Sequence, residues 1–304
     1  MDPIMFQIGP LAVRWYGFLI ATGVLIGSFW ATRLLEQRGL DADKLLDMAP
    51  YLVVAGLIGA RLVYVVTSPS AFFGPGGKLL DVFKIWQGGI SIHGGILGIM
   101  IALAIFASLN NLNMWAYADA LTPLGALGIM GGRIGNFMNG TDTGGRLTDW
   151  PIAFHWPEVG TPTLGAFGRV VFGDTLWRFA PPACAAVPVG EPCMIHLAQL
   201  YGFLVGFILI FIALWAFRRT TTPGFAFWQF VLWYSILRSV IEEPFRDNPL
   251  FWQLYVNDSG GVGLLTLTQL VSIPLILLAI YLLLTMDPDT AVRKEQLSVR
   301  AGKR

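Results

Sequence analysis

Long apolar runs separated by short polar segments are the main pattern along this 304-residue chain. The runs occupy residues 15–32, 48–67, 90–109, 117–138, 196–217, 225–242 and 264–285. A helix that crosses the hydrocarbon layer of a bilayer needs about 20 mostly apolar residues, and each run is close to that length. The pattern therefore predicts an all-α polytopic membrane protein with seven transmembrane helices.

The composition excludes an ordinary soluble domain. Hydrophobic residues make up 55% of the chain and charged residues only 13%, whereas soluble domains average about 25% charged residues. The charged side chains also avoid the apolar runs, which contain only Arg61, Asp119, Arg133, Arg238 and Glu242. An ionisable side chain at bilayer depth is costly, so such a residue is by default a candidate functional residue.

Basic residues predict how the chain is oriented in the membrane. Only Arg14 closely precedes the first run, whereas Arg33, Arg38 and Lys44 follow it. Because cytoplasmic loops are enriched in Lys and Arg, we expect the N-terminus outside and the C-terminus in the cytoplasm. The first run lacks the features of a removable signal peptide. No compact basic patch occurs outside the C-terminal tail, so we expect no nucleic-acid partner.

One long insertion interrupts the pattern between the fourth and fifth runs. Residues 139–195 are rich in Pro, Gly, Thr and Trp. Their short β-like runs at 151–156 and 169–172 predict a small irregular periplasmic head. Cys184 and Cys193 both lie in this head. A disulfide persists on an outward face, but the sequence leaves a disulfide and two free thiols equally open.

The rest of the chain offers no second domain. We expect residues 1–304 to form a single integral membrane domain that carries the head as an insertion. The tail at 286–304 is polar and basic, and such a composition predicts disorder on the cytoplasmic side.

The fourth run ends in GGRIGNFMNG, the segment with the clearest candidate chemistry. Arg133, Asn136, Phe137 and Gly140 follow the spacing i, i+3, i+4, i+7 and therefore share one helix face. The planar guanidinium of Arg133 matches two phosphate oxygens, and a low dielectric strengthens that pairing. The alternative is an arginine that pairs with an acid or reaches to the membrane interface.

Two further segments place charges in the membrane. Arg238 and Glu242 are four residues apart in LRSVIEEPFR. They either neutralise each other within one helix, or Glu242 orients Arg238 toward a substrate. Arg61, in GLIGARLVYV, stays open between a role at the membrane boundary and a contact with a lipid phosphate.

Three histidines are present, and one of them is a candidate base. His93, in WQGGISIHGGILG, has glycines on both sides that leave room for a ligand. An imidazole with a pKa near 6.5 accepts a proton at neutral pH; the alternative is a hydrogen-bonded interfacial histidine. We expect His196 to be structural and His155 to lie at the surface. The spacing of the three is not that of a metal site, so we expect no metal.

Alternating helix directions bring several candidates to the same side of the membrane. Tyr16, His93, Arg133, Asn136 and Arg238 all fall toward the predicted outer ends of their helices. Phosphate-binding groups and one base at the outer leaflet indicate phospholipid chemistry.

The run at 132–139, GRIGNFMN, resembles the signature of bacterial prolipoprotein diacylglyceryl transferases, which reads G-R-x-G-N-F-x-N-x-E-x-x-G. Five other segments match the family in the same order: IGPLAVRWYG, FKIWQGGISIHGGILG, HLAQLYG, the segment of Arg238 and Glu242, and TQLVSIP. A single GRxGN is a weak signal, but six ordered segments cover nearly the whole chain.

The resemblance implies an enzyme of the bacterial inner membrane. Such an enzyme transfers the diacylglyceryl group of phosphatidylglycerol to the lipobox cysteine thiol of a preprolipoprotein, which forms a thioether and releases glycerol phosphate. The resemblance implies neither a cofactor nor a metal. It implies catalytic roles for Tyr16, His93, Arg238 and Glu242, and contacts with phosphatidylglycerol for Arg133, Asn136 and Arg238.

The chain departs from the family pattern in two places. The Glu position of the signature holds Thr141, and Asp142 follows it in a stretch, TDTGGR, that is one residue longer than usual. Gly144 or Gly145 then takes the last glycine of the motif. We predict that Asp142 replaces the missing Glu and that Asp142 and Gly144 contribute to phosphatidylglycerol binding. The alternative is that no acid is needed here and that Asp142 only terminates the fourth helix. The family segment HPSQLYE reads HLAQLYG here and has lost its acid.

Two other functions stay open on the sequence alone. One is a lipid or anionic-solute transporter whose arginines line a pathway, and the other is a divergent paralogue without catalytic activity. The halves of the chain show no convincing repeat, which counts modestly against an inverted-repeat transporter.

Overall fold

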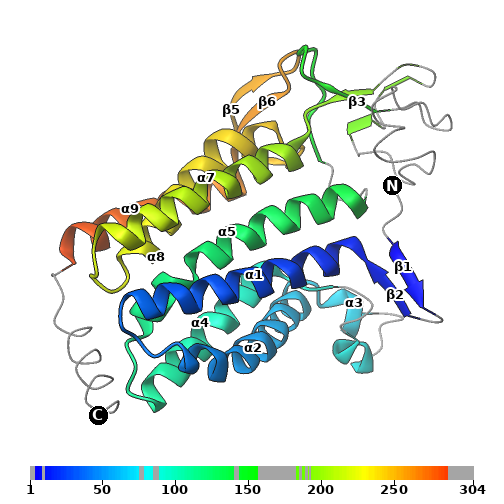
Figure 1. Ribbon diagram of the computed structural model, residues 1–304. Helices are drawn as coiled ribbons and strands as arrows, with labels where there is room; N and C mark the ends of the chain where they lie inside the picture. Colours follow the sequence, from blue (N-terminus) through cyan, green and yellow to red (C-terminus); the bar gives the residue numbers. More distant parts are fainter. Residues whose placement is uncertain are drawn as a thin grey trace, which may run out of the picture. The chain divides into compact units, whose positions relative to one another are not determined.

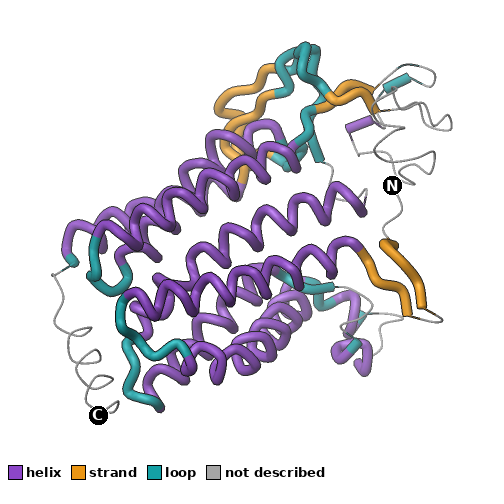
Figure 2. The backbone as a smooth tube through the Cα atoms, viewed as in Figure 1, coloured by secondary structure: helices purple, strands orange, loops and turns teal. Residues whose placement is uncertain are grey.

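The computed structural model is mostly helical, and its few strands form separate pairs (Figure 2). It describes residues 4–8, 11–74, 79–84, 89–139, 144–156, 183–184, 187–188, 191 and 193–286. Three predicted features lie outside these residues: the β-like run at 169–172, the pair Thr141 and Asp142, and the tail after Met286.

Each of the seven apolar runs coincides with a described helix (Figure 1). The helices are α1 (Trp15–Gln37), α2 (Asp43–Thr67), α4 (Ile92–Leu109), α5 (Met114–Asn139), α7 (Ala198–Arg219), α8 (Phe225–Leu237) and α9 (Leu267–Thr285). An apolar segment in lipid must satisfy its backbone hydrogen bonds internally, and the helix is the local structure that does so.

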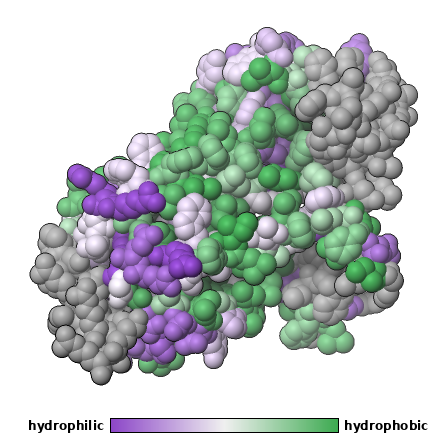
Figure 3. Space-filling view, in the orientation of Figure 1, coloured by the Kyte–Doolittle hydropathy of each residue, from purple (hydrophilic) through white to green (hydrophobic). Residues whose placement is uncertain are grey.

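Five of these helices, α1, α2, α4, α7 and α9, are long and apolar enough to cross a membrane. Many of their side chains are apolar and exposed, for example Leu25 at 72%, Val66 at 76% and Leu284 at 81%. The space-filling view shows hydrophobic side chains over much of the helical surface (Figure 3). Such a surface fits lipid as its solvent, so the chain is a multi-pass membrane protein. Seven spans stay a prediction, because α5 and α8 are not among these five and α8 has only 13 residues.

The chain divides into two compact units. The first comprises the described residues within 4–31, 121–220 and 225–286, and the second comprises those within 32–120 and 221–224. In the first unit, α1 packs along α5 at glycines: a Cβ at Gly135 would lie 3.0 Å from the Cα of Tyr16.

The core of the first unit lies where α5, α7 and α8 meet. Ala126 of α5 and the pair Val205 and Leu209 of α7 are fully buried there, and Phe230 of α8 packs against them. α9 packs on α8. These helices therefore form the frame that carries the polar groups near the ends of α5 and α8.

In the second unit, α2 and α4 are in backbone contact. A side chain at Gly59 would collide with the carbonyl of Gly94, and one at Gly98 would collide with the carbonyl of Ala55. Short helices, α3 (Ser70–Phe73) and η1 (Leu79–Phe83), lie between α2 and α4 in the sequence. The small residues at this contact allow the close approach that is typical of membrane helices.

Three antiparallel strand pairs lie between or before the helices. β1 (Ile4–Ile8) pairs with β2 (Leu11–Arg14), β3 (Phe154–Trp156) with β4 (Cys193–Ile195), and β5 (Leu250–Asn257) with β6 (Val262–Thr266). β3 falls inside the strand-like run predicted at 151–156. The periplasmic position of this region stays a prediction.

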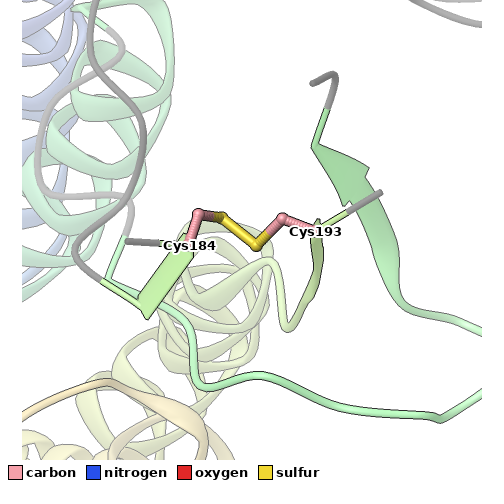
Figure 4. Close-up of a disulfide and its surroundings, with 2 residues drawn as sticks. All are labelled: Cys184 and Cys193. Carbon is pink, nitrogen blue, oxygen red and sulfur yellow. A yellow bond between two sulfur atoms is a disulfide. The ribbon is translucent and has the colours of Figure 1, made fainter. Parts of the chain in front are cut away.

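Cys184 and Cys193 form a disulfide, which decides between the two alternatives that the sequence left open (Figure 4). Both residues are buried in a cluster with Ile195, and Phe137 and Met138 of α5 pack against it. The disulfide therefore ties the first residue of β4 to a cluster at the end of α5.

Candidate functional site

A π-helical turn, η4 (Arg238–Glu242), continues α8 and positions the candidate site. The N–H of Glu243 donates to the carbonyl of Arg238 five residues earlier, where an α-helix would use a spacing of four. The next turn, η5 (Glu243–Phe245), contains Pro244, which cannot continue the helical ladder. Glu242 and Glu243 are both fully buried. The wide turn thus places two successive carboxylates in the interior of the first unit.

Glu242 binds three arginines. Its Oε1 lies 2.5 Å from Nη2 of Arg133 on α5 and 3.1 Å from Nη1 of Arg246, and its Oε2 lies 3.4 Å from Nη1 of Arg238. The exposed fraction of the side chain is 12% for Arg133, 17% for Arg238 and 9% for Arg246. Charge-assisted pairs with little exposure are the strong ones, so Glu242 fixes the three guanidiniums around one point.

Glu243 supplies a second carboxylate. Its Oε2 lies 3.4 Å from Nη2 of Arg238, and its Oε1 accepts hydrogen bonds from Asn248 at 2.7 Å and Thr266 at 2.9 Å. Tyr234, one turn before Arg238 on α8, lies 3.4 Å from Nη1 of that arginine. Arg238 is therefore held by two carboxylates and a phenol.

We call Arg133, Arg238, Arg246, Glu242 and Glu243 the arginine cluster. Three arginines and two glutamates give it a formal charge of +1. Moving an ion from water into a protein interior costs roughly several kcal/mol, even after the protein has relaxed around the charge. A buried positive excess is therefore a favourable place for an anion, and the fork of a guanidinium matches phosphate oxygens.

Gly202 on α7 makes room for the arginine cluster. A Cβ at this position would lie 2.5 Å from Nε of Arg133 and 2.8 Å from Oε2 of Glu242. Any side chain here would displace the ion pair. The acid that the family pattern has at this position is thus excluded by packing in this chain, and Glu243 provides the second carboxylate of the cluster.

The chain segment after the signature crosses beside the cluster. The N–H of Arg146 donates to the carbonyl of Phe245 at 2.9 Å, and the carbonyl of Arg146 accepts from the N–H of His196 at 3.0 Å. Gly145 forms a β-bridge with Arg246. This segment is therefore anchored both to the end of η5 and to His196, two residues before α7.

Of the two glycines in this segment, only Gly145 is required by packing. A side chain at Gly145 would collide with the carbonyl of His196, whereas the nearest atom to a Cβ at Gly144 is the nitrogen of Asp247 at 4.0 Å. Gly144 still contributes its carbonyl, which accepts from the N–H of Asp247 at 2.5 Å. The structure thus favours Gly145 as the last glycine of the motif.

His196 is fully buried and hydrogen-bonded on both sides of its ring. Its Nε2 lies 2.8 Å from the carbonyl of Gly260, which can only accept, so Nε2 carries the hydrogen. Nδ1 then accepts from the hydroxyl of Tyr201 at 2.9 Å. Burial lowers the pKa of His196 below its ordinary value, although the Gly260 carbonyl acts in the opposite direction. These contacts confirm the structural role expected of His196.

The structure brings three of the predicted site residues together: Arg133, Arg238 and Glu242. Both ion pairs considered for these residues are present, because Arg133 pairs with an acid and Arg238 with Glu242 at i+4. Glu242 is shared with Arg246, so the pair of Arg238 and Glu242 is not a closed, neutral one. Asn136 lies on α5 one turn after Arg133. Tyr16, on α1, packs against Gly135 of α5.

His93 and Arg61 belong to the second unit. His93 is the second residue of α4 and is exposed. Arg61 is 8% exposed, and its guanidinium donates to the carbonyls of Asp81, Val82 at 2.8 Å and Gly89 at 2.6 Å. Arg61 therefore holds the segment that precedes α4, a role that the sequence left open.

Sequence reasoning missed Tyr234, Arg246 and Glu243. Arg246 continues the i+4 spacing of Arg238 and Glu242, so a longer helical pattern would have found it. Glu243 would point elsewhere in a regular α-helix, and only the π-turn brings it to Arg238. Within the described residues, no group of three or more His, Cys, Asp or Glu side chains is arranged as metal ligands.

Comparisons with known proteins agree on one family. The family model described as prolipoprotein diacylglyceryl transferase matches residues 3–285. The phosphatidylglycerol–prolipoprotein diacylglyceryl transferase of Thermus thermophilus is 46% identical over 290 residues, which cover 95% of this chain and 100% of the relative. The protein of the same name from Deinococcus radiodurans is 42% identical, with 93% and 85% covered, and that from Thermoanaerobacter is 31% identical, with 92% of each covered. The chain therefore belongs to the prolipoprotein diacylglyceryl transferase family.

Proposed function

We propose that this protein transfers the diacylglyceryl group of phosphatidylglycerol to the lipobox cysteine of a preprolipoprotein. The cysteine sulfur forms a bond to the terminal glycerol carbon of the diacylglycerol unit. The bond between that carbon and the phosphate oxygen breaks, and glycerol phosphate leaves with the bonding electrons. The products are a thioether and a phosphate monoester, and the thiol proton passes to a base.

One observation carries this proposal: the arginine cluster has a buried formal charge of +1 near the ends of α5 and α8. Phosphatidylglycerol carries one negative phosphate. As the phosphate leaves, its negative charge grows, and fixed guanidiniums stabilise that charge more than they stabilise the bound lipid. Arg133 and Arg238 are the groups that we assign to this task.

We assign the remaining roles from the match to the family signature. His93 takes the proton of the thiol, because a thiol with a pKa near 8.5 is mostly protonated at neutral pH. Glu242 orients the arginines, Asn136 contacts the phosphatidylglycerol headgroup, and Tyr16 acts beside them as a catalytic residue.

We also infer that the signature loop of this chain is shifted by one residue. Gly145, rather than Gly144, is the position where no side chain fits. Counted back from Gly145, the acid of the pattern E-x-x-G falls on Asp142 and not on Thr141. This register supports Asp142 as the replacement for the missing Glu. Asp142→Asn should then strongly impair thioether formation, and Thr141→Ala should have a mild effect; a fully active Asp142→Asn protein of normal abundance contradicts the shift.

The membrane placement follows from the same proposal. The protein spans the bacterial inner membrane seven times, with its N-terminus outside and its C-terminus in the cytoplasm, as the basic residues after α1 favour. The insertion at 139–195 is then periplasmic, where the disulfide between Cys184 and Cys193 persists.

Mass spectrometry of a lipobox peptide tests the proposal directly. The purified protein is incubated with the peptide and phosphatidylglycerol, and we expect a diacylglyceryl mass on the cysteine. Lysine keeps the charge of arginine but loses its fork, so Arg133→Lys and Arg238→Lys should each lower the rate at least about tenfold. Arg218→Lys, at the exposed end of α7, is the matched control and should retain the wild-type rate.

Two results would contradict the proposal. A wild-type protein that forms no thioether but moves phosphatidylglycerol across a vesicle membrane is a transporter. A protein that does neither, although folded, is a divergent paralogue without catalytic activity. Wild-type rates in both arginine variants would leave these side chains with only a structural role.

A further inference from the structure

The first turn of α9 carries a glutamine whose side chain makes more contacts than a helix cap requires. Thr266 caps α9: its hydroxyl accepts from the N–H of Gln269, and the Gln269 side chain reaches back to the N–H of Thr266 at 3.0 Å. This reciprocal arrangement is an ordinary capping box. The amide of Gln269 has a second half, its NH₂ group, which the capping box does not use.

The NH₂ group of Gln269 bonds to the π-turn. Its Nε2 donates to the carbonyl of Ser239 at 2.8 Å. In the π-type spacing of this turn, the donor for that carbonyl would be the N–H of residue 244, five positions later. Residue 244 is proline, which has no N–H. Gln269 therefore supplies, from another helix, the donor that Pro244 cannot provide.

A second route leads from Gln269 to the arginine cluster. The hydroxyl of Thr266, which accepts from Gln269, donates to Oε1 of Glu243 at 2.9 Å. The other oxygen of Glu243 lies 3.4 Å from Nη2 of Arg238. Thr266 and Glu243 are both buried, with exposed fractions of 1% and 0%. The route therefore runs through groups that are shielded from water.

The glutamine also stabilises an unfavourable backbone position. Leu265 has a φ of 77°, which is costly for a residue with a branched side chain. Its N–H donates to Oε1 of Gln269 at 2.6 Å. The side chain of Gln269 thus fixes the backbone on both sides of the cap and the carbonyl of Ser239 at once.

We infer that Gln269 is a positioning residue for Arg238, and that it holds the π-turn in the form that directs Arg238 and Glu243 into the arginine cluster. The inference rests on the proposed function, in which Arg238 binds the phosphate of phosphatidylglycerol. Gln269 itself does not touch Arg238 in any contact described above; it acts through Ser239, Thr266 and Glu243. A residue that only caps α9 would have no particular relation to Arg238.

A double-mutant cycle separates these two readings. Methionine has a length and helix propensity similar to those of glutamine but lacks the amide. Gln269→Met therefore removes the bond to Ser239 and the two bonds that Oε1 accepts from the N–H groups of Leu265 and Thr266, and keeps only the bond from its own N–H to the Thr266 hydroxyl. We expect Gln269→Met to lower kcat/KM for phosphatidylglycerol about tenfold in the wild-type background. In the Arg238→Lys background, the same change should lower kcat/KM less than about twofold, because residues that act as one unit are not additive.

Ser272→Ala is the matched control for a lost hydrogen bond in the same helix. Ser272 is 6% exposed and its hydroxyl donates to the carbonyl of Thr268 at 2.9 Å, one turn beyond the cap. Its removal should lower the melting temperature less than Gln269→Met does, because Ser272→Ala loses one side-chain bond and Gln269→Met loses three. It should leave kcat/KM within about twofold of the wild type, since Ser272 has no bond to the π-turn among those described.

The Thr266 link gives a second test if Gln269→Met fails to fold. Thr266→Ser keeps the hydroxyl that donates to Glu243, and Thr266→Val keeps the shape without it. We expect Thr266→Ser to retain kcat/KM within about threefold and Thr266→Val to lose about tenfold. Equal rates for the two variants would contradict the route through Glu243.

The outcomes also separate this inference from the proposed function. If Gln269→Met lowers kcat/KM by the same factor in both backgrounds, Gln269 acts independently of Arg238 and the inference is wrong. If the wild type forms no thioether, the proposed function fails. The inference is then tested by phosphatidylglycerol binding, measured as the rise in melting temperature that the lipid causes. Gln269→Met should reduce this rise in the wild-type background and leave it unchanged in the Arg238→Lys background. Any other result contradicts the inference.

Discussion

Glu242 is the group whose loss should disturb this protein most. Its carboxylate faces Arg133 at 2.5 Å, Arg246 at 3.1 Å and Arg238 at 3.4 Å, and its side chain is 1% exposed. Glu242→Gln keeps the shape of the side chain and removes its charge. Glu243, which contacts Arg238, would then be the remaining carboxylate of the arginine cluster.

The expected magnitude follows from the cost of an uncompensated buried charge. Removal of one partner from a buried ion pair typically costs about 3–5 kcal/mol. One kcal/mol shifts the melting temperature of a domain of this size by roughly 2 °C. We therefore expect Glu242→Gln to melt roughly 6–10 °C below the wild type and to lose most of its transferase activity.

Thermal unfolding in detergent, followed by tryptophan fluorescence, measures this shift. Glu36→Gln is the matched control, because Glu36 pairs with Arg33 at 3.3 Å but is 54% exposed. Exposed pairs contribute at most about 1 kcal/mol, so this variant should melt within about 2 °C of the wild type.

Phosphatidylglycerol gives the same experiment a second readout. If the cluster binds the phosphate, an added anion partly replaces the missing carboxylate. Phosphatidylglycerol should then raise the melting temperature of Glu242→Gln more than that of the wild type, and a zwitterionic lipid should not. The reasoning is refuted if Glu242→Gln melts within about 2 °C of the wild type.

Two further predictions concern residues beside the cluster. Gly145→Ala should abolish activity and lower abundance, because a Cβ there collides with the carbonyl of His196, whereas Gly144→Ala should keep at least about half of the wild-type rate of thioether formation. The melting temperature of the wild type should fall as the pH drops below about 6.5, because the unfolded chain takes up a proton that buried His196, with its lowered pKa, does not. His196→Gln should melt lower at pH 7.5 but show a smaller further loss at pH 5.5; an equal loss in both proteins assigns the pH dependence to other groups.

The helices of this chain were predictable from its sequence because lipid imposes a simple requirement. A run of about 20 apolar residues in a bilayer has to be a helix, and each of the seven runs coincides with one. The helix ends were less predictable, because they depend on local chemistry. α1 extends through Gln37, past the apolar run, since polar residues continue a helix beyond the hydrocarbon layer.

Part of the site followed from spacing alone. Arg238 and Glu242 lie at i and i+4, so one helix was enough to predict their ion pair. The partner of Arg133 was not predictable in this way, because it comes from another helix. It depends on Gly202, whose missing side chain leaves the space that Arg133 and Glu242 occupy.

Glu243 was not predicted as a partner of Arg238, because a regular α-helix was assumed for this segment. With 3.6 residues per turn, neighbouring residues point about 100° apart, so Glu242 and Glu243 would not serve the same arginine. The π-turn changes this rotation, and Arg238 lies 3.4 Å from both acids. A proline immediately after two acids was the available signal that the regular helix ends here.

The departure from the family pattern at position 202 is explained by the space and the charges around the arginine cluster. At position 202 the family has an acid, and this chain has a glycine that Arg133 lies across. Within the cluster, Glu243 contributes a carboxylate to Arg238 from the π-turn. That turn in turn depends on Gln269 for a hydrogen-bond donor. Gly202 and Glu243 therefore contribute to the same cluster in different ways, the first by leaving space and the second by its charge. Gly202→Glu should abolish activity whether Glu243 is retained or changed to Gln, because the added side chain collides with Arg133 and Glu242 in both backgrounds. A Gly202→Glu protein with at least about half of the wild-type rate of thioether formation would contradict this packing argument.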